Sequence, residues 1–100
     1  DMVADNGERL FVETGAEGEE NLKRFLHIND SLGLFTIEQH PLSNDSDHYP
    51  FAMKEVPALY MMVDGDAYDV YHTPLDNSGN MYINRYLPLF RLVTAFASTF

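Results

Sequence analysis

The sequence predicts an α/β fold in which helices pack on a mixed sheet. Short segments of alternating apolar and polar residues, typical of strands, are separated by segments whose apolar residues recur at helical spacing. The chain has 100 residues, 45% hydrophobic and 22% charged, which is ordinary for one small globular unit. Its longest apolar runs are about strand length, so we expect no membrane-spanning segment.

The first half of the chain predicts strands on either side of a helix. Residues 9–14 and 34–39 each alternate as a strand does, with β-branched or aromatic residues on one face. Between them, residues 19–32 form an amphipathic pattern with an acidic first turn, and Gly33 is well placed to end the helix. We also expect residues 1–3 to be the end of a strand, because α/β sheets carry functional side chains there.

The middle of the chain predicts a short helix and a buried strand. Ser46 or Asp47 is expected to cap a helix that ends near Met53. Residues 58–63 are almost continuously apolar. We therefore expect a strand with both faces covered.

The last helix is expected to begin after Asn84 as its N-cap and to run to Ser98. Pro88 then occupies the fourth helical position, where its missing N–H removes at most one intrahelical bond. The predicted buried stripe consists of Leu89, Val93, Phe96 and Phe100, supported by Tyr86, Phe90 and Ala97.

Charge and composition exclude several classes of function. The net charge is -10 with only six Lys and Arg, so the chain has no basic surface for nucleic acid, and we expect no nucleic-acid partner. The absence of cysteine excludes thiolate metal sites and leaves histidine and carboxylate as the strong metal ligands.

Three segments carry candidate chemistry, and they occur in a fixed order: Asp1-Met2-Val3, then Ser46-Asp47-His48-Tyr49-Pro50-Phe51, then Tyr71-His72-Thr73-Pro74-Leu75-Asp76. In this order they resemble the last three active-site segments of the M28 family of zinc aminopeptidases. Residues 54–59 also resemble the family segment that leads into a strand, so the resemblance covers almost the whole chain. Ala4 and Glu55 stand where the family usually has Gly.

The resemblance implies a fragment of the zinc-exopeptidase fold, which is a three-layer α/β/α arrangement. Residues 1–100 would form the carboxyl-terminal portion of one catalytic domain. The remaining metal ligands of the family, and its general base, lie upstream of the segment that Asp1 begins.

The resemblance also implies roles for individual residues. Asp1 and His72 would each bind a different ion of a two-zinc site, and Tyr71 would donate its phenol to the developing oxyanion. Residues that orient the ligands through hydrogen bonds are expected at Asp47, His48 and Asp76. Alternatively, Tyr71 is a half-buried aromatic residue and Asp76 caps a turn. His27 and His40 lie in no motif and are expected on the surface.

The function implied is hydrolysis of N-terminal residues from peptides by a metal-activated water. A glutaminyl cyclase is the alternative within the same architecture, but it usually has Trp where this chain has Tyr71. A non-catalytic binding domain of the same fold is a third interpretation. We expect the isolated chain to be inactive and to self-associate through an exposed sheet edge. Because such enzymes are commonly exported, we also expect an extracytoplasmic location.

Overall fold

The computed structural model describes the backbone of residues 1–100 and all their side chains except those of residues 67 and 68. Three strands alternate with three α-helices in the order β1 (Arg9–Thr14), α1 (Glu19–Leu32), β2 (Thr36–Gln39), α2 (His48–Met53), β3 (Leu59–Val63) and α3 (Tyr86–Ala97). Short 3₁₀ helices occur at Ala16–Gly18, Asp66–Val70 and Ser78–Asn80. The alternation confirms the predicted α/β class.

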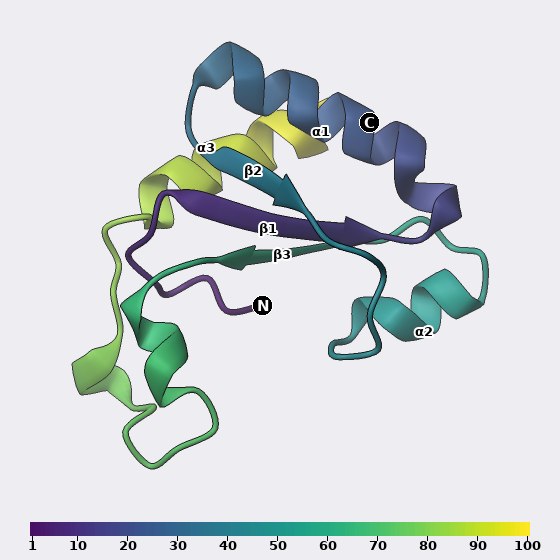
Figure 1. Ribbon diagram of the computed structural model, residues 1–100. Coiled ribbons are helices and arrows are strands. Elements are labelled where there is room, and N and C mark those ends of the chain that lie inside the picture. Colours follow the sequence, from purple (N-terminus) through teal and green to yellow (C-terminus); the bar gives the residue numbers. More distant parts are fainter.

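The sheet is mixed, as predicted, with the strand order β2-β1-β3. The central strand β1 pairs parallel with β2 and antiparallel with β3, so that Leu10 lies opposite both Ile37 and Val63. Helices α1 and α3 pack together over one face of this sheet, and α2 lies on the other side of the strands (Figure 1). None of the helices in the described part of the chain is long and apolar enough to cross a membrane.

The two faces of β1 have different roles because side chains alternate along a strand. Leu10 and Val12 are fully buried and belong to the hydrophobic core beneath the helices. The other buried members of this core are Leu22, Phe25, Phe35, Val63 and Leu92. Phe11 and Glu13 therefore point to the opposite face, where the candidate site lies.

The buried side-chain amide of Asn29 connects the end of α1 to the residue before β2. Gly33 ends α1 with φ of 63°, a left-handed conformation that favours glycine, and its N–H donates to the Asn29 carbonyl at 2.7 Å. The Asn29 side chain accepts from the Phe35 N–H at 3.0 Å and donates to the Phe35 carbonyl at 2.8 Å. Since these groups are already bonded, β2 begins at Thr36 rather than at the predicted Leu34.

The predicted start of the last helix was wrong by one residue. Arg85 is the N-cap of α3, and Pro88 is consequently the third helical residue. The Arg85 guanidinium donates to the Leu34 carbonyl at 2.7 Å and lies 4.6 Å from the centre of the Phe35 ring. Asn84, the expected cap, instead donates its side-chain amide to the Asn6 carbonyl at 3.5 Å. Contacts with distant residues therefore decide where α3 begins.

The predicted buried stripe of α3 was also partly wrong. Leu92 is fully buried, and Leu89 and Phe96 are partly buried against the core. Val93 is 37% exposed and Phe100 74% exposed, and the supporting residues are exposed as well: Tyr86, Phe90 and Ala97. Because α3 packs against α1, the stripe that meets the core runs through Leu92, one residue away from the predicted Val93.

Two predictions for the β3 side of the sheet were wrong: that both faces of β3 are covered, and that residues 1–3 form a strand. The first four residues of β3 are only half-buried and Val63 alone is buried, because the strand pairs with β1 on one side only. Residues 1–3 run beside β3 but are not a strand. Met2 has φ of 52°, which is outside the strand region, and its carbonyl accepts a single backbone bond from the Val63 N–H at 3.1 Å.

The start of α2 is uncapped. Asp47 occupies the N-cap position as expected, but its side chain makes no capping hydrogen bond. Its backbone is already in the helical region, with φ of -66°, rather than in the extended region that a capping side chain normally requires.

Candidate functional site

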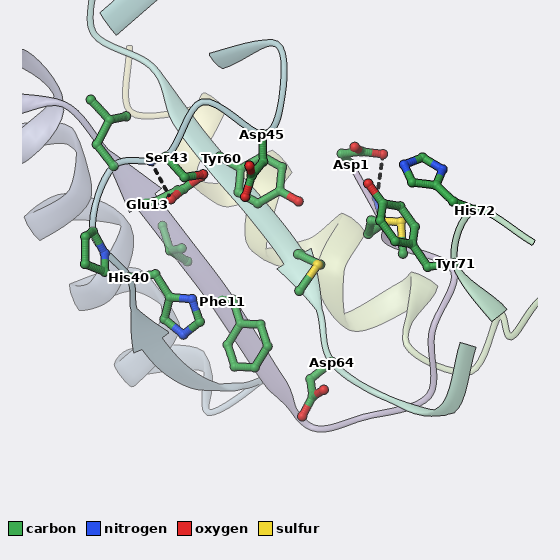
Figure 2. Close-up of a pocket in the computed structure, with 15 residues that line it drawn as sticks. Asp1, Phe11, Glu13, His40, Ser43, Asp45, Tyr60, Asp64, Tyr71 and His72 are labelled. Carbon is green, nitrogen blue, oxygen red and sulfur yellow. Dashed lines mark hydrogen bonds between the residues drawn. The ribbon is translucent and has the colours of Figure 1, made fainter. Parts of the chain in front are cut away.

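A cavity of about 950 Å³ lies on the sheet face opposite α1 and α3. Its floor is formed by side chains of β1 and β3, namely Phe11, Glu13, Tyr60 and Met62. The loop of residues 40–45 forms a side wall. Asp1, Tyr71 and His72 lie at one end, as Figure 2 shows. The size is within the range of small-ligand sites.

Asp1 is held at this end by two hydrogen bonds to its carboxylate. One oxygen accepts from the Met2 N–H at 2.8 Å, and the other accepts from the Ser46 hydroxyl at 3.3 Å. Ser46 was expected from the sequence only as a possible helix cap, although it begins one of the three segments that carry the resemblance. The contact joins the first of these segments to the second.

Tyr71 and His72 reach the cavity from the loop that follows Asp66–Val70. His72 is exposed and has φ of 58°, a left-handed conformation that histidine adopts more readily than most residues. The two rings are tilted together with their centres 3.7 Å apart. In Figure 2 the hydroxyl end of Tyr71 points toward Asp1. The fold therefore brings Asp1 together with Tyr71 and His72, which lie 70 and 71 positions further along the sequence.

Of the three residues expected to orient ligands, two line a groove beside Asp1 and the third lies away from it. Asp47 is exposed and lines a smaller groove beside Asp1 and Ser46. His48 lines the same groove but is buried, and its ring stacks on Tyr60 with centres 4.8 Å apart. Asp76 lies in an exposed turn and lines neither hollow. The roles of all three stay predictions.

A buried carboxylate that the sequence did not single out anchors the cavity wall. Glu13 is 6% exposed and accepts from the Ser43 hydroxyl at 2.7 Å and from the Ser43 N–H at 3.1 Å. His48 Nε2 lies 2.8 Å from the same carboxylate, although this contact is not aligned as a hydrogen bond. In the sequence Glu13 is simply the polar member of an alternating strand, which gives no sign of its partners.

Glu13→Ala is expected to lower the free energy of unfolding by about 2–4 kcal/mol. The change removes both hydrogen bonds of Ser43 and leaves the buried His48 without a charged partner. Urea denaturation measures the effect, with the exposed Glu8→Ala as the matched control. Equal midpoints for the two variants would contradict the anchoring role.

The rim of the cavity carries its own charge network. Arg9 donates to Glu38 at 3.2 Å and to Asp64 at 3.0 Å. His40 stacks on Phe11 and places its Nε2 3.1 Å from Glu38. The hydrogen bond with His40, followed by attraction to Arg9, holds the pKa of the Glu38 carboxyl below its usual range. At the rim, Asp64 is thus already paired with Arg9, and His40 already contacts Glu38.

The residue types at the end of the cavity are ones that commonly bind zinc. An imidazole and a carboxylate are ordinary zinc ligands, and Asp1 and His72 present one of each at the same end. Among the described side chains, however, there is no group of three or more histidine or acidic residues that could hold a metal ion. These residues therefore account for part of a ligand set.

The model of Peptidase family M28 matches residues 1–97. The chain belongs to peptidase family M28. This confirms the resemblance inferred from the three segments, and it places the protein among the peptidases, which are hydrolases. No curated protein and no solved structure matches the chain.

One departure of this M28 chain from the family pattern coincides with an unusual backbone conformation. Glu55, which the resemblance places where the family usually has Gly, has φ of 59°. A left-handed conformation costs a residue with a side chain about 1–2 kcal/mol. The local turn therefore keeps the shape that suits glycine, whereas Ala4, the other departure, does not have a positive φ.

Proposed function

We propose that this M28 chain forms the carboxyl-terminal part of the catalytic domain of a zinc-dependent aminopeptidase. The observation that carries the proposal is the convergence of Asp1, Tyr71 and His72 at one end of a cavity on the open face of the sheet. A carboxylate and an imidazole can hold zinc for metal-assisted hydrolysis, and a phenol can donate a hydrogen bond to a developing oxyanion.

Each of these residues has a distinct proposed role. Asp1 and His72 bind different zinc ions, and the Ser46 hydroxyl fixes the Asp1 carboxylate by the hydrogen bond at 3.3 Å. Zinc, when bound, polarises the scissile carbonyl and activates the attacking water. Tyr71 donates its hydroxyl to the oxygen on which negative charge develops.

The cavity next to these residues is proposed to bind the N-terminal residue of a peptide. Its walls combine apolar surface from Phe11, Tyr60 and Met62 with polar groups at the rim, which is the usual composition of a small-ligand site. Tyr71 in place of the tryptophan usual in glutaminyl cyclases favours hydrolysis over cyclisation.

The isolated 100-residue chain is expected to show no zinc-dependent peptidase activity. Each zinc would have one protein ligand from this chain, whereas a catalytic zinc normally has three. No general base is assigned among its residues, and proton transfer alone contributes roughly 10² to 10⁴ in rate.

The test compares this chain with a longer M28 protein that contains it, using an N-terminal leucine chromogenic substrate with and without a chelator. Activity of the longer protein that the chelator abolishes supports the proposal. Zinc-dependent turnover by the isolated chain would show that the wrong residues have been assigned. Cyclisation of an N-terminal glutamine peptide without hydrolysis would identify a cyclase instead.

A further inference from the structure

The part of the cavity beyond the catalytic end has aromatic and flexible apolar walls. Phe11 and Met62 are paired neighbours on β1 and β3, and Tyr60 lies two residues from Met62 on the same face. The His40 ring stacks on Phe11 with centres 4.5 Å apart and extends the aromatic wall. Such a surface accommodates a long methylene chain.

Four carboxylates line the cavity, those of Asp1, Glu13, Asp45 and Asp64. Three of them are engaged, because Asp64 pairs with Arg9, Glu13 accepts two bonds from Ser43, and Asp1 is held by Ser46. Asp45 makes no hydrogen bond or ion pair with any side chain that the structure describes. In Figure 2 the Asp45 side chain points from its loop toward the cavity.

The loop that carries Asp45 is held in place by hydrogen bonds of the residues on either side of it. Ser43, two residues before Asp45, is fixed to Glu13 through both its backbone N–H and its hydroxyl. Ser46, the residue after Asp45, is fixed to Asp1. Because the loop is tied on both sides of Asp45, little conformational entropy is lost when a ligand binds there.

We propose that this cavity selects peptides with a basic N-terminal residue, lysine or arginine, and that Asp45 is the residue that determines this specificity. The inference rests on the proposed aminopeptidase function. The methylene stem packs on Phe11, Tyr60 and Met62, and the cationic end pairs with the Asp45 carboxylate. An acidic side chain would meet an excess of carboxylates, and an apolar one would leave the exposed Asp45 carboxylate without an ionic partner.

The experiment uses the longer, zinc-loaded protein that contains this chain and two substrates that differ in charge but hardly in length. N-terminal lysine is expected to give a kcat/KM about tenfold higher than N-terminal norleucine, which is what one charge-assisted hydrogen bond at a partly open site supplies. Asp45→Asn is expected to remove this preference by lowering the lysine value about tenfold while the norleucine value stays unchanged. Asp30→Asn, on the exposed face of α1, makes the same charge change and is expected to preserve the preference.

A binding measurement separates failure of this inference from failure of the proposed function. Calorimetry compares lysinol with norleucinol, which contain no scissile bond, on the wild type and on Asp45→Asn. Tighter binding of lysinol that depends on Asp45 supports the selective cavity, whether or not peptides are hydrolysed. Equal binding of the two ligands overturns the inference. Hydrolysis of norleucine and lysine substrates at equal rates would also overturn it while leaving the aminopeptidase function intact.

Discussion

Replacing His72 with alanine in the longer protein that we propose contains this chain is expected to remove most peptidase activity and about one zinc ion per molecule. A zinc-binding imidazole is not easily replaced, and the other histidines near the cavity are committed elsewhere. His40 stacks on Phe11 and contacts Glu38. His48 is buried against Glu13. Neither can take the place of His72 without breaking these contacts.

Metal analysis of the purified His72→Ala variant, together with its kcat/KM, measures both effects. The control is His27→Ala, which removes an exposed histidine from the surface of α1. A urea midpoint close to that of the wild type shows that the loss of activity does not come from unfolding of the domain. Unchanged zinc content together with full activity would refute the assignment of His72 as a ligand.

Tyr71→Phe is expected to lower kcat by about 10² while KM changes little. The substitution keeps the ring, so the contact with the His72 ring at 3.7 Å is preserved and only the hydroxyl is lost. Removal of one donor to a developing oxyanion typically costs this much, and it acts on the transition state rather than on substrate binding.

Steady-state kinetics separate this role from a structural one. The matched control is Tyr86→Phe, which removes a hydroxyl from a side chain that is 63% exposed on α3. If Tyr71 were a half-buried aromatic residue and nothing more, its variant would unfold at a lower urea concentration and keep a near-normal kcat. That combination would exclude the oxyanion role.

The secondary structure was largely predictable because most elements follow local rules. Alternation identified β1, and helical spacing identified α1 with the bounds Glu19–Leu32. Gly33 ends that helix in the left-handed conformation, as its position suggested. These features depend on residues close together in sequence, and their physical causes act within a few positions. The family, too, was evident from three short segments.

The placement of side chains depended on contacts between distant residues. Leu92 rather than Val93 is buried, because the packing of α3 against α1 sets the rotation of the helix. Likewise, β2 starts late because the Asn29 amide bonds the backbone of Phe35. A pattern shows that a helix has an apolar side, but which residue of that side meets the core is decided by the partner element.

In the candidate site, too, the sequence identified residue types and the tertiary structure determined their contacts. From the sequence alone came Asp1, Tyr71 and His72 as chemically competent residues and the order of the segments that carry them. Only the tertiary structure decided that they meet at one end of a cavity, that Glu13 anchors the wall through Ser43, and that Asp45 is left facing the cavity. The reason is that residue type determines which bonds a side chain can make, whereas the long-range fold determines which partners lie within reach.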